Sequence, residues 1–245
     1  MNLGLEGKVC VVTGGTRGIG AASARMLSQE GAQVLTVARH GADVELDVSA
    51  PDAGERLLAA CPELPWALVN NAGTSQARAL DELTDADWQE QWDLHVMAPM
   101  RLMRAFAPAM AAAGGGRIVN VSSSSGRRPS RRLDASYSVT KAAELSLSRV
   151  FADTFAAKGV LVNAVTPGAV DGELWKEEGG LADQIAARSG STRDEVLAAT
   201  RSSPPLGRMG TDDEVAAVVV FLCSERASNV TGAAWAVDGG SVPVI

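Results

Sequence analysis

The feature that most constrains the fold is a regular alternation, along the whole chain, of short apolar runs and longer stretches with helical character. Near-continuous apolar runs are typical of strands covered on both faces, as the strands of parallel sheets are. The predicted strands lie at 9–12, 34–38, 67–69, 118–121, 160–165 and 233–237, and the predicted helices at 18–30, 86–112, 135–157 and 211–223. This order predicts an α/β fold built on one doubly wound parallel sheet of about seven strands, with helices on both faces.

No linker, repeat or low-complexity tract divides the 245 residues, so we predict a single domain over 1–245. One connection is unusual, because residues 39–43 are too few for the crossover that normally joins parallel strands, which takes at least roughly 10–12 residues. We expect a tight link or a single turn there.

Composition disfavours several classes of partner. The hydrophobic fraction of 46% supports a substantial core, whereas the net charge of −7 argues against binding to nucleic acid or to an anionic membrane. The longest apolar run, 215–223, is far shorter than the roughly 20 residues of a membrane span, and the N-terminus has no apolar signal core. Three scattered cysteines and two histidines show no metal-ligand spacing. We therefore expect a cytoplasmic protein without a metal.

A glycine-rich turn, Thr13-Gly-Gly-Thr-Arg-Gly-Ile-Gly20, joins the first predicted strand to the first predicted helix. Glycines allow a tight turn and a close approach of the backbone to a pyrophosphate, which the helix N-terminus then faces with its N–H groups. The turn therefore predicts dinucleotide binding. Its candidate binding residues are Gly14, Thr16, Arg17, Gly18, Ile19 and Gly20.

Tyr137, the only tyrosine of the chain, is followed four positions later by Lys141. Residues four apart share one face of a helix. A phenol is a poor acid or base near neutral pH, but a nearby cation favours its ionised form and makes it a usable proton donor and acceptor. The same spacing also arises by chance on exposed helices, so the pair needs support from the rest of the sequence.

That support comes from a resemblance to the short-chain dehydrogenase/reductase family, in particular to its 3-oxoacyl-[acyl-carrier-protein] reductase-like members. Further motifs that carry the resemblance are Asn70-Asn71-Ala72-Gly73, Ile118-Val119-Asn120-Val121-Ser122-Ser123, Asn163-Ala164-Val165-Thr166-Pro167-Gly168, Pro205-Leu206-Gly207-Arg208 and Val237-Asp238-Gly239-Gly240. They occur in the family's order over nearly all the chain. The resemblance implies a Rossmann-type domain, a homotetramer, and hydride transfer between a nicotinamide cofactor and a small-molecule carbonyl or alcohol.

The resemblance also implies catalytic roles. Tyr137 would exchange a proton with the substrate oxygen, Lys141 would hold the cofactor ribose, and a serine hydroxyl would polarise the same oxygen. Strand position selects Ser123, whereas counting back thirteen residues from Tyr137 selects Ser124; strand register is fixed by the pleat, so we favour Ser123. His95 stands where the family usually has an asparagine that supports a proton-conducting water, and is either a relay or a structural residue.

Cofactor choice depends on the end of the second strand. Ala38 stands where NAD-preferring relatives have an aspartate, while Arg39 and Arg17 are placed to bind a 2′-phosphate. These residues predict NADP(H), with NAD(H) as the alternative. The remaining positions implied to contact the cofactor are Asp47, Val48, Asn71, Ala72, Gly73, Tyr137, Lys141, Pro167, Gly168 and Val170.

Two segments are expected to shape the substrate end. Residues 127–132 carry four arginines in six positions, which suit an anionic substrate or an acyl-carrier partner, or else form a solvated loop or a subunit contact. Residues 171–203 resemble the family's variable lid, with Gly179-Gly180 as a hinge. Two alternatives stay open beside an NADP(H)-dependent carbonyl reductase: an NAD-dependent dehydrogenase of a cyclic, acidic or sugar alcohol, and a nucleotide-sensing protein without turnover.

Overall fold

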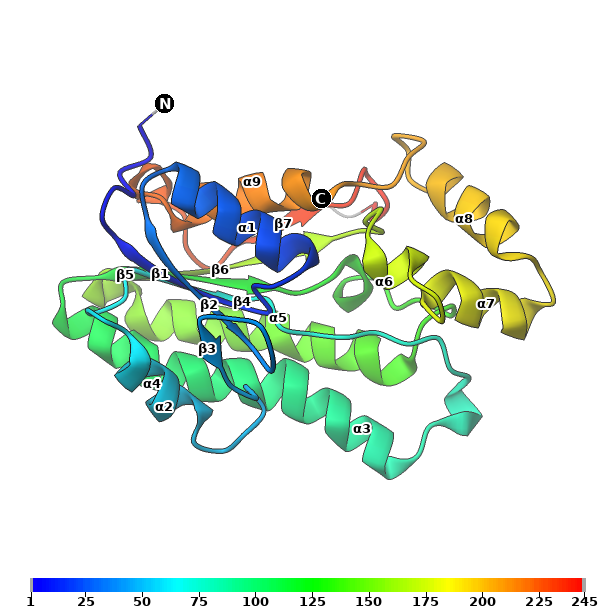
Figure 1. Cartoon of the computed structure of the whole chain (residues 1–245), viewed down its shortest axis with the longest axis horizontal. Coiled ribbons are helices and arrows are strands. Elements are labelled where there is room, and N and C mark those ends of the chain that lie inside the picture. Colours follow the sequence, from blue (N-terminus) through cyan, green and yellow to red (C-terminus); the bar gives the residue numbers. More distant parts are fainter. Residues whose placement is uncertain (1, 244–245) are drawn as a thin grey trace.

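Seven parallel strands form one sheet at the centre of the computed structural model, which describes residues 2–243. Their spatial order is β3-β2-β1-β4-β5-β6-β7, so the direction of winding reverses between β1 and β4 (Figure 1). This order confirms the predicted doubly wound Rossmann-type fold, and the reversal point is where such folds bind nucleotides. The strands are β1 (Val9–Thr13), β2 (Gln33–Ala38), β3 (Val44–Glu45), β4 (Ala67–Asn70), β5 (Gly116–Val121), β6 (Val160–Pro167) and β7 (Ala234–Val237).

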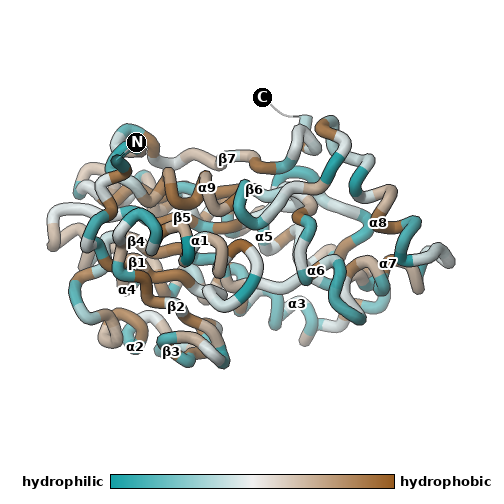
Figure 2. Tube along the Cα trace, turned by 45° about the horizontal axis from the view of Figure 1, so that its top comes forward, coloured by the Kyte–Doolittle hydropathy of each residue, from teal (hydrophilic) through white to brown (hydrophobic). Residues whose placement is uncertain are grey.

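Helices cover both faces of the sheet (Figure 1). On one face lie α1 (Gly18–Gln29) and α9 (Asp212–Cys223); on the other lie α2 (Ala53–Ala60), α4 (Ala98–Ala112) and α5 (Ala135–Phe155). The neighbours Val11 and Val12 point to opposite faces and enter different cores, Val12 with Leu27 and Val11 with Phe106. Both faces of a strand are thus buried, which explains its uninterrupted apolar run. Figure 2 shows these hydrophobic segments along the central strands.

The predicted helix at 86–112 is interrupted in the structure. α3 (Asp85–Trp92) passes into α4 through a π-helical turn, Asp93–Met97, which contains His95. A π turn inserts an extra residue into the helical ladder and is frequent at functional sites. Helix periodicity does not reveal such a turn, because the residues on either side keep their helical pattern.

The link at 39–43 contains no helix. Asp43 folds back, and its carboxylate accepts hydrogen bonds from the Thr36 N–H at 2.9 Å and the Thr36 hydroxyl at 2.6 Å. These bonds lower the pKa of Asp43. The link therefore follows the prediction of a tight connection, and β3 lies directly beside β2.

The lid segment folds into three helices that sequence analysis did not predict, α6 (Glu173–Lys176), α7 (Leu181–Ser189) and α8 (Arg193–Ser202). The last two form a small core of their own, built from Leu181, Ile185, Val196 and Leu197. Gly179 precedes them with a φ of +74°, in the left-handed region that glycine tolerates. In Figure 1, α7 and α8 extend beyond the end of the sheet.

Within residues 2–243, no helix has the length and apolar character needed to cross a bilayer. In the same part of the chain, no three His, Cys, Asp or Glu side chains are grouped as metal ligands would be. Cys10 and Cys223 are buried and unpaired, and burial raises the pKa of the Cys10 thiol to about 12.

Candidate active site

The glycine turn lies at the carboxyl end of β1 and leads into α1, which begins at Gly18. The preceding Arg17 is extended and offers no side-chain cap, and the first turn carries no acidic residue. By contrast, α3, α8 and α9 each begin with a threonine whose hydroxyl accepts a backbone N–H. The first N–H groups of α1 thus have no side-chain partner and face the mouth of the turn, where an anion would be stabilised.

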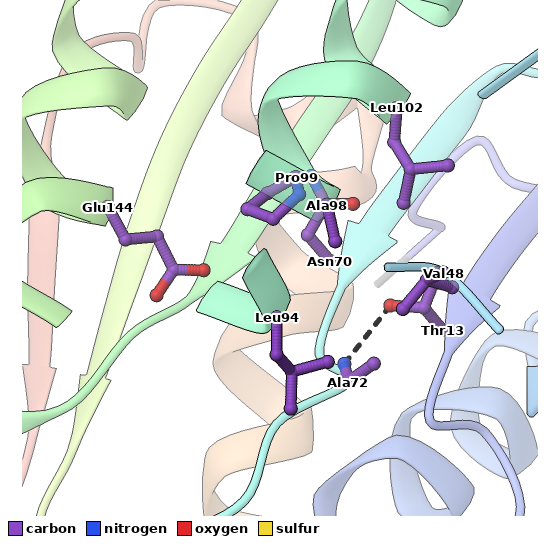
Figure 3. Close-up of a pocket in the computed structure, with 9 residues that line it drawn as sticks. All are labelled: Thr13, Val48, Asn70, Ala72, Leu94, Ala98, Pro99, Leu102 and Glu144. Atoms are coloured by element: carbon purple, nitrogen blue, oxygen red, sulfur yellow. Dashed lines mark hydrogen bonds between the residues drawn. The ribbon is translucent and has the colours of Figure 1, made fainter. Parts of the chain in front are cut away.

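The segment after β4 holds this turn in place. Thr13 Oγ1 accepts the N–H group of Ala72 at 3.1 Å (Figure 3) and that of Asn71 at 3.0 Å. The Asn71 side-chain amide donates to the carbonyls of Thr13 and Gly14. A Cβ on Gly20 would lie 2.0 Å from the Gly14 oxygen, so only glycine fits there. Such a backbone cradle, open to the start of a helix, fits a dinucleotide pyrophosphate.

Arg17 and Arg39 follow the neighbouring strands β1 and β2, and both are exposed. Arg17 forms a long ion pair with Glu177 of the lid segment, with Nη1 3.8 Å from the carboxylate. The pKa of Asp47, beyond β3, is lowered first by hydrogen bonds from Ser49 and also by the charge of Arg39. Two positively charged side chains, Arg17 and Arg39, therefore lie at the edge of the sheet where the sequence predicted a 2′-phosphate.

Tyr137 and Lys141 lie on one face of α5. The Lys141 ammonium is buried and donates to the Val121 carbonyl and to a Glu144 carboxylate oxygen, each at 2.9 Å. Glu144 is as deeply buried as its partner. Sequence analysis missed Glu144, although it stands three positions after Lys141 and seven after Tyr137, spacings that share a helix face.

His95 lies against Tyr137, with ring centroids 5.5 Å apart in an edge-on arrangement. Its Nε2 is 3.2 Å from the Thr74 backbone nitrogen, and its Nδ1 is 3.1 Å from Thr140 Oγ1. Because the Thr74 N–H can only donate, Nε2 must accept and Nδ1 must carry the proton. Burial lowers the pKa of His95 well below its usual value, and the Lys141 charge adds to this effect. The imidazole is therefore neutral, with both nitrogens engaged.

Comparison with known proteins gives the family. The family model described as enoyl-(acyl carrier protein) reductase matches residues 14–241. Sorbitol dehydrogenase from Cereibacter sphaeroides is 32% identical over 97% of this chain and 98% of its own length. The chain belongs to the short-chain dehydrogenase/reductase family. It is thus an oxidoreductase, as its relatives of that family are.

Two other relatives extend this comparison. The 3-oxoacyl-[acyl-carrier-protein] reductase FabG of Vibrio cholerae is 31% identical over 97% of this chain and 98% of its own. L-Sorbose reductase from Gluconobacter frateurii, whose structure was solved with NADPH and L-sorbose, superposes with a TM-score of 0.90 at 32% identity, over 100% of both chains. The short-chain dehydrogenase/reductase fold therefore extends over this whole chain.

The serines that follow β5 have different partners. Ser122 Oγ donates to the Lys141 carbonyl at 2.8 Å, which ties the end of the strand to α5. Ser123 Oγ accepts the Ser125 N–H at 3.1 Å, so its own proton is free to donate. Ser123 is buried at the end of the strand, whereas Ser124 is half-buried in the following turn. Of the two candidates, the hydroxyl of Ser123 is the one whose oxygen is held by the backbone.

An ion pair between a half-buried arginine and a buried carboxylate anchors the start of the tyrosine-bearing helix. Asp134, three residues before Tyr137, is completely buried and accepts bonds from the Arg78 backbone at 2.7 Å and from its guanidinium at 3.0 and 3.2 Å. Arg78 also pairs with Asp87 of α3. The loop after β4 and two helices are thereby fixed together, an arrangement that sequence analysis did not anticipate.

The remaining predicted positions lie at the carboxyl end of β6 and in the arginine segment. Gly168 donates its N–H to the Val237 carbonyl at 3.0 Å, with Pro167 before it, and Val170 forms an isolated bridge to Gly210. The four arginines of residues 127–132 are all exposed, and none forms an ion pair with a carboxylate within the part of the chain that the structure describes.

Proposed function

We propose that the protein interconverts a carbonyl and a secondary alcohol with NADP(H), and that Tyr137 exchanges the proton on the reacting oxygen. The observation that carries this proposal is the placement of Tyr137 and the buried Lys141 on one face of α5, beside the serines that follow β5. The glycine cradle at the carboxyl end of β1 supports dinucleotide binding at the same edge of the sheet.

Each residue has a distinct proposed role. The cofactor, when bound, supplies or accepts the hydride. Tyr137 donates a proton to the carbonyl oxygen in reduction and removes it in oxidation, and Ser123 donates a hydrogen bond to that oxygen. Lys141 holds the ribose and favours the ionised phenol through its charge. His95 acts as a positioning residue against the Tyr137 ring, because neither of its nitrogens is free to pass a proton.

The proposed preference for NADP(H) rests on Arg17 and Arg39 and on the lack of a carboxylate at Ala38. Asp47 and Val48 would border the adenine. Asn71, Ala72 and Gly73 would line the ribose side, and Pro167, Gly168 and Val170 the nicotinamide side. The NADPH complex of L-sorbose reductase, a relative of matching fold, agrees with this preference.

For the substrate we propose a small polar carbonyl or alcohol, since relatives of this chain are named for acting on sorbitol, galactitol and L-sorbose. The exposed arginines of residues 127–132, which form no ion pair within the described part of the chain, favour anionic compounds as a second group to test. We further propose a homotetramer formed through α3–α4, α5 and β7, supported by the exposed apolar side chains Trp92, Val139 and Val150.

Substitution of Tyr137 by phenylalanine tests the proposal. The variant keeps the ring but loses the proton, so kcat/KM should fall by about 10²- to 10⁴-fold, while NADPH binding, followed by nicotinamide fluorescence, stays unchanged. A panel of ketoses, polyols and acidic ketones supplies the substrate. Ser123→Ala should lose activity, and Ser124→Ala, its matched control, should keep it. Full activity of Tyr137→Phe, or binding of NADPH by wild type with no turnover of any compound, would contradict the proposal.

A further inference from the structure

Glu144 is a buried carboxylate with no part in the roles given above. It stands two helical turns after Tyr137 on the same side of α5, and its oxygen lies 2.9 Å from the Lys141 ammonium. Figure 3 shows its side chain reaching from α5 into a cavity also lined by Asn70, Leu94 and Pro99. Burial of an ionisable group at this depth is unfavourable, so the Lys141 ammonium, its one ion-pair partner among residues 2–243, matters strongly.

The other charged groups on the elements packed against α5 differ in burial and in partners. Asp87 of α3 pairs with Arg78, Arg101 of α4 binds the Ser49 carbonyl, and Arg117 of β5 binds the Ser224 carbonyl. Exposed charged groups on these elements are Asp85, Glu90, Arg104 and Lys158, while Asp93 of the π turn is half-buried. His95, the titratable group of the π turn beside Lys141, is neutral and has both nitrogens engaged. Tyr137, Lys141 and Glu144 thus form a line of three titratable groups along one helix face, which runs from the half-buried Tyr137 to the buried Lys141 and Glu144.

The small cavity has room for a water molecule beside the Glu144 carboxylate. Its volume is about 10 Å³, which matches the space that one water molecule needs. Asn70 lines it too, with a buried side-chain oxygen that has no protein partner. Burial raises the pKa of the Glu144 carboxyl, and the adjacent ammonium opposes that rise. The ammonium at hydrogen-bond distance favours the ionised form of the Glu144 carboxyl.

We propose that Glu144 is a positioning residue that offsets the charge of Lys141 and thereby raises the pH at which the Tyr137 phenol ionises. The inference rests on the proposed function, in which the Lys141 ammonium assists Tyr137. A positive charge favours the phenolate, and a negative charge beside that ammonium weakens its effect. Removal of the Glu144 charge should therefore ease ionisation of the phenol.

The single tyrosine makes this measurable without turnover. Because no other phenol is present, the near-ultraviolet absorbance of phenolate in the purified full-length protein reports Tyr137 alone, and Tyr137→Phe provides the blank. Glu144→Gln keeps the shape of the side chain and removes its charge. We expect the titration midpoint to move to lower pH by about 1 unit, at the lower end of what a neighbouring charge produces. The pH profile of kcat/KM should move in the same direction.

Two variants act as controls. Asp153→Asn removes a charge from the exposed end of the same helix, where Asp153 pairs with Arg149, and should leave the midpoint unchanged. Glu144→Asp keeps the charge and should stay near wild type. If Glu144→Gln does not fold, Glu144→Leu, which needs no hydrogen-bond partner at that depth, takes its place.

An unchanged midpoint, or a midpoint that moves to higher pH, overturns the proposal. Failure of the proposed function looks different, because the absorbance titration needs neither cofactor nor substrate. A shifted midpoint in a protein that turns over no carbonyl or alcohol would uphold the role of Glu144 and refute the reaction. Loss of activity in Tyr137→Phe together with an unshifted Glu144→Gln titration would uphold the reaction and refute the role of Glu144.

Discussion

Two ion pairs at the candidate active site differ sharply in their surroundings. Lys141 and Glu144 have side chains that are 5% and 3% exposed and lie 2.9 Å apart. Arg17 and Glu177 have side chains that are 64% and 46% exposed and lie 3.8 Å apart. Water and salt screen the second pair, and such pairs contribute about 0–1 kcal/mol, whereas the first pair is held in a poorly screened interior.

This difference separates two functions within one site. The fold sets the charges around Tyr137 before any ligand arrives, because neither member of the buried pair can leave without exposing an unpaired charge to the core. At the proposed cofactor-phosphate edge, a ligand can displace Glu177 from Arg17 at little cost. The proposed catalytic half is therefore preorganised, and the proposed cofactor half is open to competition.

Removal of one charge of the buried pair should destabilise the protein strongly. Lys141→Met leaves Glu144 buried without its cation, and we expect a loss of about 3–5 kcal/mol in the free energy of unfolding. The double variant Lys141→Met/Glu144→Leu replaces both charges with apolar groups and should recover most of that loss. Urea denaturation measures both variants. If Lys141→Met were as stable as wild type, the Lys141 charge would not be needed to stabilise the buried Glu144 carboxylate.

A smaller effect is expected at the cofactor edge. Arg39→Asp removes one proposed contact to the 2′-phosphate and adds a repelling charge. The lost charge-assisted contact is worth about 1.5–3 kcal/mol, so NADPH affinity should fall at least about tenfold, while NADH affinity stays the same or rises. Parallel fluorescence titrations with the two cofactors measure this. Equal losses for both would remove Arg39 from the 2′-phosphate site.

The smallest effect is expected at Glu177. Glu177→Gln frees Arg17 from its exposed partner, so NADPH should bind up to about fivefold more tightly at low salt, with the gain disappearing at high salt. Asp183, in the same lid segment but paired with Arg193, offers a control in Asp183→Asn. A gain that persists at high salt would point to a rearranged lid rather than to competition for Arg17.

Much of the fold followed from local patterns. The strands that are buried on both faces were predicted from their continuous apolar runs, and α1, α5 and α9 lie within a few residues of their predicted positions. α2 and the lid helices were missed, since they are short and owe their stability to packing contacts such as those among Leu181, Ile185 and Val196. The π turn around His95 was also missed, because one inserted residue leaves the helical pattern on either side intact.

The alternating α/β order, the glycine cradle and the Tyr137–Lys141 pair could be predicted from local patterns, because each depends on residues close together in the chain. Arg17 and Arg39 could be predicted from their places after the first two strands. The groups that surround these features depend on the folded structure. It buried the Lys141–Glu144 pair, engaged both nitrogens of His95 with Thr74 and Thr140, and joined Asp134 to Arg78 across 56 positions of the chain. Burial and long-range partners set the charge state of a site, and neither is encoded in a local motif.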